Sequence, residues 1–182
     1  TLTLGSNAAV AGTLTNTGAL TLDNTGFDIA GALVNNKTVT QTGDASMGSL
    51  TNNGAYNGAT FNLSTTDGGL TNSGQIITTG DIEVTGGDLT NNGQISTGYT
   101  SVTDGNLVNG GAITGNGGVD VYYGNFTNNG SMAVSYVTTT NGSIVNNGTI
   151  TGADYFGTYS DATDPSFTKG ADYSITNAGT IT

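Results

Sequence analysis

The sequence predicts an all-β protein: a right-handed parallel β-helix (β-solenoid) of about ten coils of 17–20 residues, with three short strands per coil. Two observations carry this prediction. One motif returns along the chain with a period near 19 residues. In addition, Gly (31), Thr (35) and Asn (22) make up nearly half of the 182 residues, and all three are poor helix formers. No apolar stripe keeps a period of 3.6 residues, so we expect a single solenoid domain over residues 1–182.

Each coil is recognised by an apolar residue that we call the anchor. The anchors are separated by 19, 17, 20, 19, 18, 19, 18 and 31 residues. The last gap therefore contains an insertion, which we assign to residues 153–174. The anchors are Leu14, Leu33, Leu50, Leu70, Leu89, Leu107, Phe126, Ile144 and Ile175.

Three further positions of the coil follow each anchor. Asn stands two residues later in every coil, and Gly stands four residues later with Lys37 as the single departure. Another apolar or aromatic residue stands six residues later, from Leu20 in the first coil to Ile181 in the last. These positions predict a first strand, a polar corner and a second strand.

A looser apolar pair precedes the next anchor and predicts the third strand. In pairs such as Ile82 and Val84, apolar residues alternate with polar ones, which indicates a half-buried strand. One coil cannot bury its own apolar residues, but stacked coils bury them in one narrow core. The repeat lacks the strict six-residue subperiod of left-handed hexapeptide helices, which favours the right-handed form.

The recurring Asn residues are predicted to form a structural ladder of stacked amides at one corner. The Gly that follows is expected to supply a positive φ there. Glycosylation, at sequons such as Asn147-Gly148-Thr149, or a catalytic role is the alternative, but the regularity of the position favours the structural role. The ladder consists of Asn16, Asn35, Asn52, Asn72, Asn91, Asn109, Asn128, Asn146 and Asn177.

Composition excludes several classes of function. Thirteen acidic residues against two Lys make the surface negative, which excludes a nucleic-acid partner. Cys and His are absent, which removes zinc sites, disulfides, Cys nucleophiles and the usual general base. No apolar run approaches the ~20 residues that a membrane-spanning helix needs. We therefore expect no enzyme, no cofactor and no membrane span.

The repeat, as in LTNNGQIST from Leu89 and ITNAGTIT from Ile175, resembles the repeats of filamentous haemagglutinin-type adhesins and the β-helical passengers of autotransporters. The resemblance covers about residues 1–152 and 175–182 and concerns the period and the Asn-Gly corner. It implies a bacterial protein, secreted to the cell surface, that forms a rod displaying binding features. It carries over no catalytic residue, because the motif contains none.

The insertion is the segment in which binding chemistry is expected, because loops added to a rigid solenoid commonly carry it. Asp161 and Asp164, with nearby carbonyl groups, are candidate calcium ligands. The alternative is a loop that folds back and covers a sheet face with its aromatic residues. The stretch GNGGVDVYY from Gly115 is one imperfect copy of a calcium-binding nonapeptide, in which Asp120 is better explained as an outward strand residue.

Three tyrosines lie near the insertion in chain order. Some of Tyr122, Tyr123 and Tyr136 should face outward by strand alternation. Exposed aromatic rings can stack on sugars or pack against a neighbouring rod.

The two ends of the chain are predicted to form a subunit interface. The C-terminal ITNAGTIT supplies two strands of a coil and stops where the third should begin, and the N-terminal strand, which opens with TLTLG before any anchor, is predicted to complete that last coil in a neighbouring subunit. Placed in series, they put Leu14 of one copy 21 residues after Ile175 of another, which is close to one coil. The interface residues are Thr1, Leu2, Thr3, Leu4, Gly5, Ile175, Thr176, Asn177, Gly179, Thr180, Ile181 and Thr182.

A head-to-tail contact of this kind does not close, so it generates a filament. The sequence thus predicts a structural subunit of an extracellular filament, with other copies of itself as partners. The alternative is a piece of a longer surface adhesin rod that binds host or matrix glycans or proteins.

Overall fold

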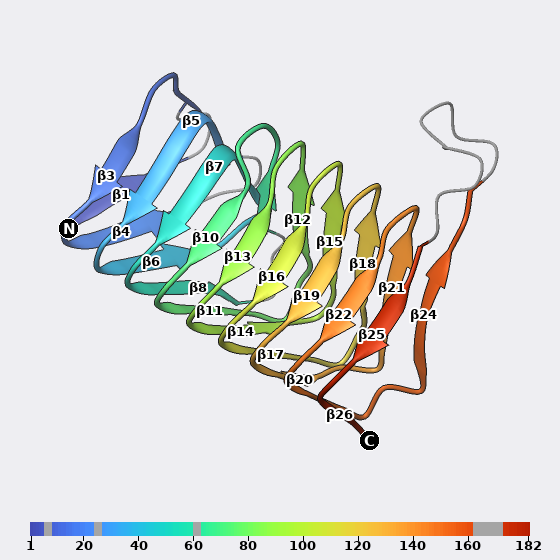
Figure 1. Cartoon of the computed structure of the whole chain (residues 1–182). Coiled ribbons are helices and arrows are strands. Elements are labelled where there is room, and N and C mark those ends of the chain that lie inside the picture. The colour runs from blue at the N-terminus through green and yellow to red at the C-terminus, as the bar shows by residue number, and fades with distance from the viewer. Residues whose placement is uncertain (6–8, 24–26, 60–62, 162–172) are drawn as a thin grey trace.

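The computed structural model describes residues 1–5, 9–23, 27–59, 63–161 and 173–182. The regular elements in these ranges are β-strands, which pair in parallel and stack coil on coil into a rod with the two termini at opposite ends (Figure 1). No helix that could cross a membrane is found in this part of the chain. The structure confirms the predicted parallel β-solenoid, while the right-handed sense stays a prediction.

The strands fall into three columns. The first is a ten-stranded sheet, which we call sheet A. It contains β1 (Leu2–Leu4), β4 (Ala19–Leu22), β6 (Thr38–Gln41), β8 (Ala55–Ala59), β11 (Gln75–Thr78), β14 (Gln94–Thr97), β17 (Ala112–Gly115), β20 (Ser131–Ala133), β23 (Thr149–Thr151) and β26 (Thr180–Ile181).

The anchor strands and the third strands form the other two columns. The anchor strands are β3 (Leu14–Asn16), β10 (Leu70–Asn72), β13 (Leu89–Asn91), β16 (Leu107–Asn109), β19 (Phe126–Asn128), β22 (Ile144–Asn146) and β25 (Ile175–Asn177). The third strands are β2 (Ala9–Val10), β9 (Leu63–Thr65), β12 (Ile82–Thr85), β15 (Thr100–Thr103), β18 (Val119–Tyr122), β21 (Tyr136–Thr140) and β24 (Tyr155–Tyr159).

Two long strands join the anchor and third columns. β5 (Phe27–Asn35) and β7 (Ala45–Asn52) each run through a third-strand segment and then an anchor segment, which merges both columns into one sixteen-stranded sheet. Gly31 and Gly48 lie where the two segments meet, and an added Cβ at either would press on backbone oxygens of the preceding coil. Glycine thus permits the continuous strand that other coils interrupt with a turn.

The core is built from residues that stack in register. In sheet A, Ile76 lies on Tyr56 and Ile95, and among the anchors Leu89 lies on Leu70 and Leu107. All six are buried and belong to one cluster that runs along the rod. The periodic apolar positions therefore become the single narrow core that stacking was expected to produce.

The predicted insertion of residues 153–174 begins with a regular element. Tyr155–Tyr159 is β24, which pairs with β21 over its full length and completes the third column of its coil. Phe156 packs against the end of the core. Residues 162–172 of the insertion lie outside the described ranges.

Negative charge collects on one side of the rod. Every described acidic residue lies in the part of a coil between the end of a sheet A strand and the start of the next anchor strand, for example Glu83 on β12 and Asp120 on β18. Lys37 lies on a different corner, between β5 and β6. The outer surface of sheet A and the anchor strands is therefore uncharged among the described residues.

Candidate functional site

The Asn ladder forms as predicted. The amide nitrogen of each Asn donates to the amide oxygen of the Asn in the next coil at 2.7–2.8 Å, from Asn16 to Asn177 without a break. Each also donates to a backbone carbonyl of the next sheet A strand, as Asn91 does to Ala112 at 3.0 Å. Asn35 to Asn146 are buried, so the ladder satisfies polar groups inside the corner and holds the coils in register.

The Gly of the corner has a different role from the one predicted. The described glycines with positive φ are Gly69, Gly86 and Gly152, none of which belongs to this position. Instead, a Cβ on Gly93 would overlap the carbonyl oxygen of Gly74 in the preceding coil, and the same holds from Gly54 to Gly179. The expectation of positive φ was wrong, because the constraint at this corner is the close approach of stacked backbones.

The one departure from Gly stands where stacking is looser. Lys37 holds this corner position in the coil that stacks on the coil of Gly18. The hydrogen bond from the Thr38 N–H to the Gly18 carbonyl is 3.2 Å long. The equivalent bond from Gln75 to Gly54 in the middle of the rod is 2.8 Å. A side chain is thus accommodated at this corner near the N-terminal end.

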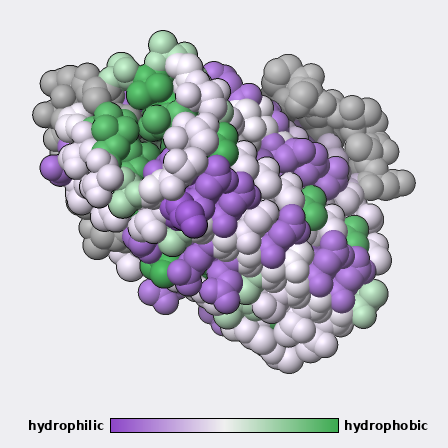
Figure 2. Space-filling view, turned by 90° about the vertical axis from the view of Figure 1, so that its left-hand side faces the viewer, coloured by the Kyte–Doolittle hydropathy of each residue, from purple (hydrophilic) through white to green (hydrophobic). Residues whose placement is uncertain are grey.

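Both ends of the rod expose apolar residues of the core. Leu2 is 48 % exposed and Ile175 is 46 % exposed, whereas equivalent residues inside the rod are buried. Leu4, Val10 and Leu14 pack only partly against the core at the N-terminal end. Figure 2, which faces that end, shows a hydrophobic cluster there.

The structure places the predicted interface residues at opposite ends of the rod, in two groups. Thr1–Gly5 contains β1, and residues 175–182 contain β25 and β26. β1 pairs with β4 and so lies in sheet A, in the same column as β26. The expectation that the opening strand would itself supply a third strand is therefore wrong, because the N-terminal strand in the third column is β2, which pairs with β5.

A cluster of tyrosines around Asp120 lies on the acidic side of the rod. Asp120 alternates with the buried Val119 and Val121, so it faces outward as predicted, yet it is only 9 % exposed. Its carboxylate accepts hydrogen bonds from the Tyr99 hydroxyl at 2.7 Å, from the Tyr136 hydroxyl at 3.3 Å, and from the Thr138 hydroxyl.

Burial and the negative charge act together on these phenols. Burial, followed by the hydrogen bond and the charge of Asp120, raises the pKa of Tyr99. Burial and the charge of Asp120 likewise raise the pKa of Tyr136. Both hydroxyls therefore stay protonated, and donate to the carboxylate, beyond the usual range of tyrosine ionisation.

The cluster borders a pocket of ≈ 550 Å³. Four tyrosines and two carboxylates line it together with Ser135, Thr138 and Thr140; they are Tyr122, Tyr136, Tyr155, Tyr159, Asp120 and Asp154. Tyr155 and Tyr159 are stacked, with ring centres 5.7 Å apart and planes 13° from parallel. They are 45 % and 50 % exposed, so the pocket opens to solvent.

Sequence reasoning found only part of this cluster. Some of Tyr122, Tyr123 and Tyr136 were expected to face outward, without a statement of which, and Tyr99, Tyr155 and Tyr159 were not connected with them. Tyr99, Tyr136 and Tyr155 occupy the same position of their coils, each one residue before a member of the register column Thr100, Val119, Val137 and Phe156. Comparing that position from coil to coil would have grouped them.

The calcium candidates gain no support from the described residues. Asp161 follows β24, and Asp164 lies outside the described ranges. No group of three or more acidic side chains that could hold a metal ion occurs in the part of the chain that the structure describes. The carboxylate of Asp120 is already the acceptor of hydrogen bonds from three hydroxyl groups.

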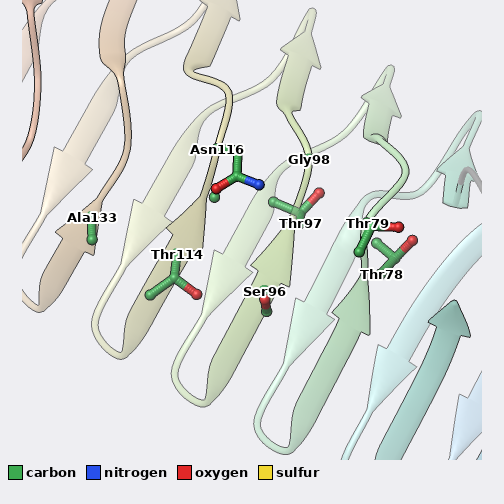
Figure 3. A pocket seen from close by; sticks show the side chains of 9 residues that line it. Thr78, Thr79, Ser96, Thr97, Gly98, Thr114, Asn116 and Ala133 are labelled. Atoms are coloured by element: carbon green, nitrogen blue, oxygen red, sulfur yellow. The ribbon is translucent and has the colours of Figure 1, made fainter. Parts of the chain in front are cut away.

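A second pocket, of ≈ 320 Å³, lies at the end of the sheet A strands and is rich in Thr and Ser (Figure 3). Its hydroxyls are used within the coil corner. The Thr97 hydroxyl is within hydrogen-bonding distance of the carbonyls of Gly80 (3.1 Å) and Tyr99 (2.9 Å), and the Thr78 hydroxyl accepts from the Gly80 N–H at 3.0 Å. This pocket is best explained as a turn stabilised by side chains.

No protein-family model, curated protein or solved structure matches the chain. The architecture and the ladder therefore classify it on their own: the chain is a β-helical repeat protein, a solenoid of stacked parallel coils with a continuous Asn ladder.

Proposed function

We propose that this protein is a structural subunit of an extracellular filament in which solenoids stack head to tail. The observation that carries the proposal is the pair of open ends, where parallel strand edges and apolar core residues are both exposed. An unpaired strand edge is a template for another strand. Stacking two ends would bury Ile175 and Ile181 of one copy against apolar residues such as Leu14 at the N-terminal end of the other.

The amide ladder favours head-to-tail order over any other. All ladder bonds point the same way, so Asn177 presents its amide nitrogen at one end of the rod and Asn16 its amide oxygen at the other. A donor therefore meets an acceptor when the C-terminal end of one copy approaches the N-terminal end of the next. Two like ends would bring donor to donor or acceptor to acceptor.

The strand columns indicate how the junction is made. Sheet A has ten strands, whereas the anchor and third columns each have nine described strands. A junction with equal columns would form between two copies of this chain if one terminal strand of sheet A left its place. We infer that β26 of one copy replaces β1 on β4 of the next, with Ile181 taking the position of Leu2.

This exchange brings the N-terminal segment onto the last coil of the neighbour. β3 would then lie on β25, and β2 would lie on β24 and supply the missing third strand. Each coil adds about 4.8 Å, so one copy would extend the filament by roughly 45 Å.

Composition supports an extracellular location. Two Lys and no Arg leave few sites for proteases that cleave after basic residues, and a backbone hydrogen-bonded from coil to coil resists local opening. The sequence repeat also resembles those of secreted haemagglutinin-type and autotransporter rods.

Electron microscopy of the purified 182-residue chain tests the proposal. We expect unbranched filaments with a ~4.8 Å axial repeat that lengthen with protein concentration. Ile175→Asp should abolish them while leaving the circular dichroism of the coils unchanged. Ile77→Asp, at an exposed apolar residue on the side of the rod, is the matched control and should leave filaments intact.

Deleting residues 1–5 tests the strand exchange. Removal of β1 should leave assembly unchanged or enhance it, because β1 competes with β26 for β4. Short monodisperse particles from the unaltered chain, or full-length filaments from Ile175→Asp, would refute head-to-tail stacking.

A further inference from the structure

We propose that the tyrosine pocket binds an organic ammonium group, as found on a lysine side chain or a small quaternary amine. This binding lies on the side of the rod and goes beyond the stacking function. The pocket is defined by Tyr122, Tyr136, Tyr155, Tyr159, Asp120 and Asp154.

The aromatic residues supply one half of the recognition. Four tyrosines border one opening, and ring faces carry partial negative charge that attracts cations. Tyr155 and Tyr159 are exposed and stacked, so they present a rigid aromatic wall without further ordering. Preformed walls reduce the entropy lost on binding.

The carboxylates supply the other half. Asp120 is almost fully buried and its hydrogen-bond donors are neutral hydroxyls, so its negative charge is stabilised but not cancelled. Asp154 lies on the same pocket. Lys37, the one lysine among the described residues, lies at a distant corner between β5 and β6. Among the described residues, the lining of the pocket is therefore electronegative and includes no cation.

The hydrogen-bonding inventory distinguishes an ammonium group from a neutral sugar. A sugar hydroxyl both donates and accepts, so a sugar site needs both kinds of group. Here the hydroxyls of Tyr136 and Thr138 already donate to Asp120. The other hydroxyl groups of the lining can donate or accept, so the excess of acceptors over donors comes from the two carboxylates, which favours a ligand that carries positive charge.

Two glycines shape the pocket. An added Cβ on Gly157, between the stacked tyrosines on β24, would overlap the hydroxyl end of Tyr155, and one on Gly118 would overlap the ring of Tyr136. The missing side chains let both rings lie down on the sheet. The positions of these two rings therefore depend on the space that the two glycines leave on the sheet.

Binding can be measured on the 182-residue chain by tyrosine fluorescence and by calorimetry. The probes are tetramethylammonium chloride, N-acetyl-lysine amide, methyl glucoside and calcium chloride, with sodium chloride held at equal ionic strength. We expect saturable binding of the two ammonium probes that weakens as sodium chloride rises. Tighter binding of the lysine probe would identify a partner chain as the source, and tighter binding of tetramethylammonium a small molecule.

Variants connect the signal with the pocket. Tyr159→Ala should weaken ammonium binding by about two- to thirtyfold, the range of a cation–π contact, and Asp154→Asn should also weaken it, because it removes a negative charge from the pocket lining. Asp88→Asn, which removes a carboxylate from a corner away from the pocket, should leave affinity unchanged, and melting curves should show that all variants fold. Binding of methyl glucoside or calcium without the ammonium probes, binding unaffected by both pocket variants, or no binding of any probe would overturn the proposal.

Discussion

At the scale of single residues, the close spacing of successive coils depends on the glycine at the corner after each anchor strand, because glycine has no side chain. The corner glycines carry no positive φ, and yet a Cβ on most of them would overlap a backbone oxygen one coil away. The sequence pattern identified the corner glycine correctly, but the predicted reason for it, a positive φ, was wrong. The distance between successive coils cannot be read from one coil.

Replacing Gly93 by Ala should therefore be costly. The new methyl group would overlap the Gly74 carbonyl, and we expect the free energy of unfolding to fall by about 2–3 kcal/mol. Gly18 holds the same position in the first coil, where a Cβ would meet nothing, so Gly18→Ala should change stability by less than about 1 kcal/mol. Urea unfolding followed by circular dichroism measures both, and equal losses would contradict this account.

A second residue-scale prediction concerns Tyr136. Its pKa is raised by burial and by the charge of Asp120, so its hydroxyl should ionise above pH 10 in the folded protein. Because the folded pKa is the higher one, the associated stability is complete below pH 10 and is lost as the pH rises through the folded pKa.

Ultraviolet titration of the Asp120→Asn variant tests this point. Without the carboxylate charge, Tyr136 should ionise at lower pH than in the unaltered chain. The Tyr136→Phe variant identifies the part of the titration curve that belongs to Tyr136. Identical titration curves before and after the substitution would show that Asp120 does not influence the phenol.

At the scale of elements, the corner that follows each anchor strand is held by the Asn ladder. The columns of strands, the anchor positions and the ladder were all predicted, because each depends on a residue repeated in every coil. The fusion of two columns through β5 and β7 was not predicted, since it depends on close backbone contacts at Gly31 and Gly48. β24 was missed because the long gap concealed a regular third strand.

Asn91→Ala should break the ladder locally. It removes the bonds to Asn109 and Ala112 and takes away the side-chain acceptor of the buried Asn72 amide, so we expect a loss of about 2–4 kcal/mol. Asn92, the next residue, is exposed, and Asn92→Ala should cost less than about 0.5 kcal/mol. Thermal unfolding of the two variants measures the difference in stability. Equal losses for Asn91→Ala and Asn92→Ala would show that the ladder contributes little.

At the scale of the whole molecule, the rod has distinct ends and distinct sides. Its ladder and its parallel strands point one way, which underlies the proposed head-to-tail filament and its test by Ile175→Asp. Its acidic residues lie along one side, and the surfaces of sheet A and the anchor strands carry no described charge. Copies in a filament would therefore align their acidic sides only if the junction kept the coil register.

The sequence by itself determined the coil: its length, its three strands, its buried positions and the Asn corner. It could do so because these features repeat, and each copy of the motif reports the same local requirement. Only the tertiary structure decided which column β1 joins, why the corner needs glycine, and how five tyrosines gather near Asp120. Those features arise from contacts between coils, where a missing Cβ in one strand makes room for a side chain from another part of the sheet.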